Sequence, residues 1–333
     1  MAAVEFGVSY FGVRDPRHVR TDLDEIAAAG FKSVTHTFSE HDLRYHAKDV
    51  AAIVAETKSR GLEAVLDPWG VAGLFGGEAW SELALVNLDS RQIDAQGASV
   101  PASCPNAPAT RALLHRWAKL ALEFGADCLF WDEPHFYLGA LRGGPRVPCC
   151  RCHHCARVFL EEHGVATLPP EGDPNLEDFR GRTIANLLHE LLTAMRGASA
   201  VQTLCLLPFG EFQGAGTDDW ERLGSLAGWQ RLATDPYWMD RPVSVREFVS
   251  RQSKRLRSLC DATGTQMEVW IQGIRIPRGD EWKIQEAVDA ALTEGAERIA
   301  FWSYRATDRM SSLTCEDPEA AWNAMLEAVR RNS

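Results

Sequence analysis

Two adjacent carboxylic acids, Asp132 and Glu133, stand at the end of an apolar run in the segment LFWDEPHF, residues 129–136. Side chains alternate between the two faces of a strand, so both acids can enter one site only if the chain bends there. A carboxyl group shielded from water keeps its proton at higher pH and can then act as a general acid. The pair is therefore a candidate for acid–base chemistry, with the longer Glu133 as proton donor.

Further acids and aromatic residues follow other short apolar runs. Aromatic rings stack on the C–H faces of sugars, and carboxylates and arginine bind sugar hydroxyl groups, so this mixture favours a small carbohydrate as substrate. Asp235, in TDPYW, is the candidate partner for the acid pair. The candidate substrate-binding residues are Asp67, Trp69, His135, Glu211, Tyr237, Trp238, Gln272, Arg275, Trp302 and Tyr304.

Four of the nine cysteines crowd into CCRCHHC, residues 149–155. In a reducing compartment such a cluster is more typical of a metal site than of a disulfide framework. The C-x-C-x-x-C motif supplies three thiolates of a tetrahedral zinc site, and either the adjacent Cys149 or the distant Cys104 supplies the fourth. Four thiolates leave no open coordination position, so the predicted zinc is structural. We expect no organic cofactor.

The elements that position these residues follow a repeating pattern of a short apolar run, a loop and an amphipathic helix. Eight such runs predict an α/β fold of the (β/α)8 TIM-barrel type, with residues 1–333 as a single barrel domain. A doubly wound sheet is the alternative, but the first run lacks the glycine-rich phosphate fingerprint. The runs are residues 5–12, 33–38, 63–69, 127–134, 202–210, 230–238, 266–273 and 298–305.

Two connections are longer than a plain barrel needs, at about residues 70–108 after strand 3 and 135–175 after strand 4. Barrel enzymes build their active sites from loops at the C-terminal ends of the strands, and long loops in a compact domain usually serve a function. We therefore expect both long loops to border the site.

The charge and hydropathy of the chain exclude several kinds of partner. The net charge is −11 and no run of lysine or arginine is present, which argues against binding to nucleic acid. The first ten residues, MAAVEFGVSY, do not resemble a signal peptide, and no apolar run approaches the roughly 18 residues of a membrane span. We expect a cytoplasmic protein without a membrane partner.

The cysteine motif, the preceding CPNAPATR (residues 104–111) and the following ARVFLEEHG (156–164) resemble glycoside hydrolase family 42. These β-galactosidases have a (β/α)8 barrel, and the resemblance covers mainly residues 100–165. It implies that Cys104, Cys150, Cys152 and Cys155 hold a structural zinc. It also implies that Glu133 is the acid/base. Asp132 stands where the family has Asn, and Gln272 where it has the nucleophilic Glu.

Because a glutamine cannot attack an anomeric carbon, three mechanisms stay open. In the first mechanism, Asp235 pairs with Asp132 and Glu133, in an arrangement similar to that of retaining α-glycosidases. Alternatively Asp132 orients an acetamido group while Glu133 donates the proton, which resembles the substrate-assisted hexosaminidases. The third is inversion, with Asp67, Glu211 or Asp235 holding a water. Carboxyl separations of about 5–5.5 Å indicate retention, and about 6.5–9.5 Å inversion.

The sequence therefore predicts a glycoside hydrolase or glycosidase-like enzyme, with Glu133 as general acid/base and Asp132 or Asp235 as second carboxylate. Two other functions remain as alternatives. Gln272 is compatible with a non-catalytic carbohydrate-binding barrel. The acidic strand ends are compatible with a metal-dependent isomerase or lyase that uses Glu133, Asp235 and either His36 or His135 as ligands.

Overall fold

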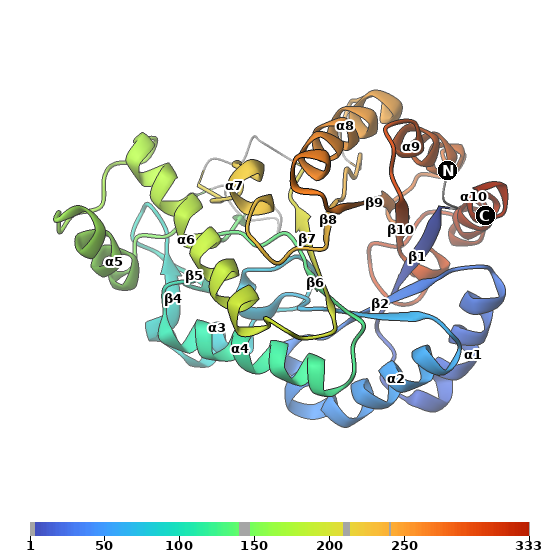
Figure 1. The fold of residues 1–333 in the computed structure, drawn as a ribbon, viewed down its shortest axis with the longest axis horizontal. Helices are drawn as coiled ribbons and strands as arrows, with labels where there is room; N and C mark the ends of the chain where they lie inside the picture. Colours follow the sequence, from blue (N-terminus) through green and yellow to red (C-terminus); the bar gives the residue numbers. More distant parts are fainter. Residues whose placement is uncertain (1–3, 140–146, 209–213, 240, 333) are drawn as a thin grey trace.

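The structure is a computed structural model that describes residues 4–139, 147–208, 214–239 and 241–332 (Figure 1). Eight parallel strands close into a barrel, and each of the eight predicted runs overlaps one of them. The predicted (β/α)8 TIM barrel is thus confirmed, and the doubly wound alternative is wrong because the sheet has no open edge. The strands are β1 (Glu5–Tyr10), β2 (Ser33–Thr37), β3 (Glu63–Asp67), β6 (Cys128–Trp131), β7 (Val201–Leu206), β8 (Arg231–Thr234), β9 (Gln266–Gln272) and β10 (Arg298–Trp302).

Helices on the outside of the barrel connect these strands (Figure 1). In α4 the buried residues include Leu114, Trp117 and Ala121, which form the predicted apolar face toward the barrel. Among the described residues no helix is long and apolar enough to cross a membrane. The helices are α1 (Pro16–Ala28), α2 (Ala47–Ser59), α4 (Pro108–Glu123), α6 (Pro174–Ala194), α7 (Trp220–Gly224), α8 (Val245–Thr263), α9 (Trp282–Thr293) and α10 (Pro318–Asn332).

The two ends of the barrel interior differ in charge pairing. At the N-terminal end, Arg231 contacts Glu63 at 3.1 Å and Glu268 at 3.4 Å, and Arg298 contacts Glu268 at 3.2 Å. Buried apolar residues, including Val65, fill the middle. Alternation along β3 from Glu63 through Val65 then brings Asp67 to the opposite end, where the acids of the predicted site gather.

The two long connections pack against each other beside the barrel, at the left of Figure 1. The first contains η2 (Val71–Gly73), α3 (Glu82–Val86), η3 (Leu88–Ser90) and the antiparallel pair β4 (Arg91–Ile93) and β5 (Ser99–Ser103). The second contains α5 (His153–His163). Arg151 N donates to Ile93 O at 2.7 Å and Ala95 N to Pro148 O at 3.0 Å, so backbone hydrogen bonds join the two loops.

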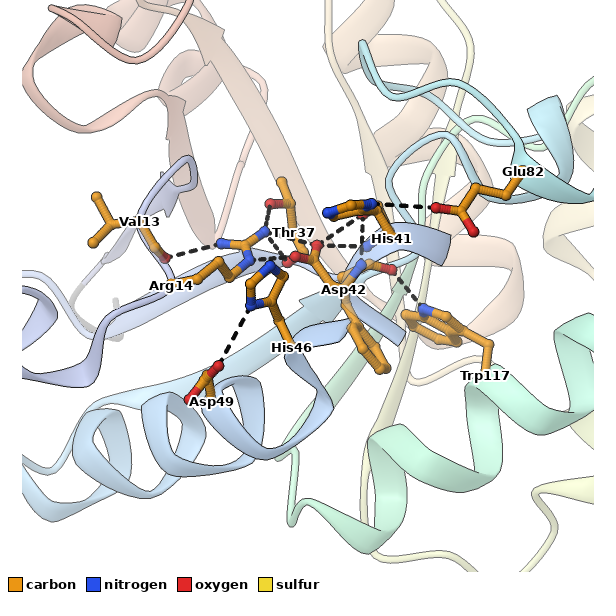
Figure 2. Close-up of polar contacts among 11 residues, drawn as sticks. Val13, Arg14, Thr37, His41, Asp42, His46, Asp49, Glu82 and Trp117 are labelled. Atoms are coloured by element: carbon orange, nitrogen blue, oxygen red, sulfur yellow. Dashed lines mark hydrogen bonds and ion pairs between the residues drawn. The ribbon is translucent and has the colours of Figure 1, made fainter. Parts of the chain in front are cut away.

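An arginine clamp fixes the rim of the barrel beside β1 and β2 (Figure 2). Arg14 binds both carboxylate oxygens of Asp42, at 2.6 and 2.8 Å, and donates to Thr37 O at 3.0 Å. Asp42 begins the short π-helix η1 (Asp42–His46) that leads into α2. A bidentate arginine–carboxylate pair is geometrically specific, so this clamp holds the β2 end against the β1–α1 loop.

Candidate active site

The chain bends at Glu133, directly after β6. Cys128 and Phe130 belong to the apolar interior of the barrel, so alternation brings Asp132 inside as well. Glu133 has a φ of 43°, in the left-handed region that residues other than glycine rarely adopt. Both carboxyl groups consequently line the same cavity. Side chains alternate along a strand, so this bend is what allows the two adjacent acids to share one site.

The cavity lies at the C-terminal end of the barrel and has a volume of about 210 Å³. This is below the roughly 300–1,000 Å³ of drug-sized pockets, so the cavity suits a small ligand. Four acidic residues line it: Asp235 is buried, whereas Asp132, Glu133 and Glu78 are partly exposed. Its aromatic lining consists of Trp69, Phe75, Phe130, Tyr137, Tyr237, Trp270 and Trp302.

Several aromatic rings form a continuous chain along the cavity. Trp69 lies 5.5 Å from Phe11, and Phe11 lies 5.3 Å from Trp302, between ring centroids. Trp302 is 6.0 Å from Trp270, and Trp270 is 5.1 Å from Phe130. These distances are typical of packed aromatic pairs. The rings therefore support one another, and all of them except Phe11 line the cavity.

The carboxyl groups of Glu133 and Asp235 influence each other electrostatically, and both residues line the cavity. Burial raises the pKa of Glu133 well above its usual value, and the charge of Asp235 raises it further. Two neighbouring buried carboxyl groups favour a state in which one of them keeps a proton. The pair can therefore hold one proton near neutral pH.

Asp132 occupies a recess formed by a glycine. A Cβ atom on Gly76 would lie 2.0 Å from Asp132 Oδ2, so only glycine leaves room for the carboxyl group. Gly77 has a φ of +104°, and a Cβ there would overlap the Trp69 ring at 1.6 Å. Burial raises the pKa of Asp132, and the neighbouring charge of Glu133 adds to this effect. The glycine pair therefore shapes both the acidic and the aromatic side of the cavity.

Asp67 lies behind the cavity wall, fully buried. Neither of its carboxyl oxygens has a hydrogen-bond partner within the described part of the chain. Burial raises the pKa of Asp67 well above its usual value, and the charges of Asp132 and Glu133 contribute as well. Burial of Asp67 therefore favours its protonated form, and the residue does not form part of the cavity surface.

Seven of the residues that the sequence singles out line the cavity. They are Asp132, Glu133 and Asp235 as candidate catalytic residues, and Trp69, His135, Tyr237 and Trp302 as candidate substrate-binding residues. Sequence reasoning missed Glu78, Phe130 and Trp270, which also line it. Phe130 stands two residues before Asp132, so alternation along the strand points both side chains inward. This spacing could have identified Phe130 from the sequence.

Gln272 does not line the cavity, which corrects its assignment as a substrate-binding residue. Its Oε1 accepts from Trp238 N and Met239 N, both at 2.8 Å, and its Nε2 donates to Ile274 O at 2.8 Å. The side chain is 1% exposed. Its amide is therefore engaged with the backbone, and it ties the loop after β8 to the end of β9.

Three more predicted binding residues lie elsewhere. Trp238 packs in the hydrophobic core outside the barrel interior. Tyr304 is buried and its hydroxyl donates to Glu25 Oε2 at 2.8 Å, away from the cavity. Arg275 is exposed at the surface and does not contribute to the cavity wall. Glu211 lies outside the described residues.

The four predicted zinc ligands come together in a buried cluster. The Sγ atoms of Cys104, Cys150, Cys152 and Cys155 all lie within 4.8 Å of one another. A tetrahedral zinc with bonds of about 2.3 Å separates its sulfurs by about 3.8 Å, so the donor set fits this metal. Cys149 is not a member of the cluster, and its Sγ contacts Val147 O at 3.9 Å instead.

The cysteine cluster connects the two long loops. Cys104 directly follows β5, whereas the other three cysteines precede or begin α5. Asn106 supports the cluster, because its backbone N donates to Cys104 Sγ at 3.3 Å and its Nδ2 to Cys155 Sγ at 3.5 Å. Such N–H donors stabilise thiolate ligands.

Replacing Asp67 by Asn is expected to stabilise the protein at neutral pH. Because the folded pKa of Asp67 is raised, the folded state binds this proton more tightly than the unfolded state, and stability decreases as pH rises. The amide removes this penalty, and we expect a gain of about 1–3 kcal/mol in the free energy of unfolding. Urea unfolding at about pH 7.5 and about pH 4.5 should show the gain mainly at the higher pH. An equal or absent gain at both values would contradict the assignment.

The fold and the cavity together define a (β/α)8 barrel with an acidic, aromatic cavity at the end where such barrels hold their active sites. No protein-family model matches the chain, and no curated protein matches it. Similar solved structures are abundant, and the sequence identities below are low enough that they show the fold alone.

One similar structure is GH5_18 from Streptomyces cattleya in complex with Manβ1-4GlcNAc, a variant enzyme with 16% identity and a TM-score of 0.61, covering 99% of this chain and 81% of that one. A second is Gan42B, a GH42 β-galactosidase from G. stearothermophilus, with 10% identity and a TM-score of 0.71. The match covers 98% of this chain but only 56% of that longer chain. A third is the endo-1,4-β-mannanase from Rhizomucor miehei, with 8% identity and a TM-score of 0.65. The match covers 99% of this chain and 95% of that one.

Proposed function

We propose that the protein is a glycoside hydrolase that acts on a small carbohydrate, with Glu133 as the general acid. The observation that carries this proposal is that Glu133 and Asp235 line the same small, aromatic-lined cavity at the C-terminal end of the barrel. Glycosidic cleavage needs a carboxylic acid that keeps its proton near neutral pH, beside a surface on which a sugar ring can stack.

The three acids of the cavity then have distinct roles. Glu133 donates its proton to the oxygen of the leaving group. Asp235 retains that proton on Glu133 before reaction, because its negative charge raises the pKa of Glu133. Asp132 is the second carboxylate, and it either attacks the anomeric carbon or takes a proton from the attacking water.

The similar structures support this proposal because the three described above are named as carbohydrate-cleaving enzymes.

The cysteine cluster supports the finer resemblance to family 42. We propose that Cys104, Cys150, Cys152 and Cys155 hold a structural zinc that fixes the two long loops beside the barrel. With four thiolate ligands the metal has no open position for substrate, so its contribution is to the stability of these loops.

A non-catalytic carbohydrate-binding barrel is the second candidate, and Gln272 is the observation that favours it. The residue where family 42 has a nucleophile is an amide held by backbone atoms. We do not propose the metal-dependent isomerase or lyase. The metal-ligand clusters found in the described residues lie outside the cavity, and His36 Nε2 contacts Thr57 Oγ1 at 2.8 Å, toward α2.

A substrate panel tests the proposed function. Purified protein is incubated with nitrophenyl α- and β-glycosides and acetylhexosaminides, and nitrophenol release is recorded. We expect turnover of at least one substrate. Sugar binding by calorimetry without turnover of any compound would overturn the proposal and support the non-catalytic barrel.

Replacing Asp235 by Asn is expected to move the alkaline limb of the pH profile to lower pH. The general acid must be protonated, so kcat/KM falls as pH rises through the pKa of Glu133. Burial keeps this pKa raised in the variant, but the contribution from the charge of Asp235 disappears. Profiles of kcat/KM against pH for both proteins measure the shift. An unchanged alkaline limb would show that Asp235 does not control the proton on Glu133.

A further inference from the structure

Two histidines and an aspartate meet beside the cysteine cluster, where the two long connections pack together. Asp89 belongs to η3 in the first connection, whereas His153 and His154 begin α5 in the second. Nε2 of His153 lies 3.4 Å from Asp89 Oδ1, and Nε2 of His154 lies 3.2 Å from Asp89 Oδ2. Both imidazole rings therefore approach one carboxylate that comes from the other connection.

The donor atoms of these three residues have the spacing of zinc ligands. A tetrahedral zinc with bonds of about 2.0–2.1 Å to nitrogen and oxygen separates its ligand atoms by about 3.3–3.4 Å. The two measured separations, 3.4 and 3.2 Å, are close to this value, and one donor atom from each residue lies within 4.8 Å of the others. An ion pair with the carboxylate needs one histidine, whereas three protein ligands are the number that open zinc sites use.

Both sides of this group are held in place by other contacts. His154 is buried, and its ring lies against that of His153 with centroids 3.9 Å apart. Ser90, next to Asp89, accepts a hydrogen bond at its backbone oxygen from Cys104 N at 2.6 Å. The backbone beside each ligand is thus fixed before a metal ion arrives, which lowers the entropic cost of binding.

The group is open to solvent, unlike the buried cysteine cluster. The side chains of Asp89 and His153 are 73% and 62% exposed, so an ion can enter directly from water. Two imidazoles and one carboxylate leave a fourth coordination position for a water molecule. These donors suit zinc and similar transition metals, whereas calcium and magnesium prefer oxygen ligands alone.

We propose that Asp89, His153 and His154 form a second metal site, which binds zinc reversibly and joins η3 to α5. Zinc held by four buried thiolates resists dialysis, whereas zinc on three partly exposed ligands exchanges with the buffer. Because the ligands come from both long connections, the bound ion adds a link between them that is separate from the cysteine cluster. The site is independent of the proposed hydrolase function.

Zinc titration of tag-free protein tests the proposal. Wild-type protein is dialysed in reducing buffer without chelator, its metal content is measured, and zinc chloride is then added in a calorimeter. We expect about one further ion to bind per chain, with a dissociation constant of roughly micromolar size, and magnesium chloride to give no binding. Zinc should also raise the Tm of the wild-type protein, because the ion binds only the folded state.

Asp89→Asn locates the added ion, because this exposed side chain can be changed without disturbing the cysteines. The variant should bind added zinc about tenfold or more weakly, lose the zinc-dependent rise in Tm and keep the ion that resists dialysis. Asp49→Asn is the matched control and should behave as wild type. Asp49 pairs with His46 at 3.4 Å but belongs to no three-ligand group among the described residues (Figure 2).

The outcomes separate this site from the cysteine site. Wild-type protein that binds no zinc beyond the dialysis-resistant ion, or an Asp89→Asn variant that binds added zinc as tightly as wild type, would overturn the proposal. If dialysis leaves the wild-type protein metal-free, the structural zinc is wrong. The second site is then still reported by one ion fewer in Asp89→Asn than in wild type, and equal numbers would refute it.

Discussion

Turnover is expected to fall by about 10²–10⁴-fold when Glu133 is replaced by Gln, with sugar binding largely retained. Glutamine has nearly the same shape but cannot donate the proton that the leaving oxygen requires. Its amide can still donate a hydrogen bond to a neighbouring acceptor, so the cavity should keep its form. The loss should therefore appear in kcat rather than in the dissociation constant of the sugar.

The measurement is steady-state kinetics of the variant on the best substrate of the panel, together with calorimetric binding of the sugar. Glu56→Gln is the matched control, because Glu56 pairs with Arg20 and Arg60 on the surface of α2, away from the cavity. The control should retain wild-type kinetics. Full activity in Glu133→Gln would remove this residue from the mechanism.

Loss of the cysteine cluster is the second large effect that we expect. Cys155→Ser should lose the bound metal and lower the free energy of unfolding by about 3 kcal/mol or more, because the two long loops are no longer joined. Metal analysis after extensive dialysis should find about one zinc per chain in the wild-type protein and almost none in the variant.

Cys149 provides the control for this experiment. It is buried and adjacent to a ligand in sequence, but its thiol is not part of the cluster. Cys149→Ser should therefore keep about one zinc per chain. Zinc lost from Cys149→Ser but retained in Cys104→Ser would reverse the assignment of the fourth ligand, and metal-free wild-type protein of full stability would refute the zinc site.

The barrel is predictable from the sequence because its determinants are local. Apolar runs such as residues 202–210 alternate with amphipathic helices, and eight repeats are sufficient to close a parallel sheet. The rule that active sites lie at the C-terminal ends of strands then selects Asp132, Glu133 and Asp235 without knowledge of the tertiary structure. All three line one cavity because each lies at or just beyond the end of its strand.

Other site residues depend on contacts that the sequence does not reveal. Gln272 stands at a strand end like the acids, but its amide is captured by the backbone of residues 238 and 239. Tyr304 is turned toward α1 by its contact with Glu25. Glu78 reaches the cavity only because Gly76 and Gly77 let the loop after β3 approach closely. Strand position is predictable in such cases, whereas side-chain direction is decided by distant partners.

The central claim is that Glu133 protonates the leaving group, and the dependence of the rate on the leaving group tests it most directly. Wild-type and Glu133→Gln proteins are compared on a methyl glycoside, which requires a proton for departure, and on a dinitrophenyl glycoside of the same sugar, which does not. We expect the variant to be impaired by about 10²-fold or more on the methyl glycoside and only slightly on the dinitrophenyl glycoside. An equal loss on both substrates would contradict the role of Glu133 as general acid.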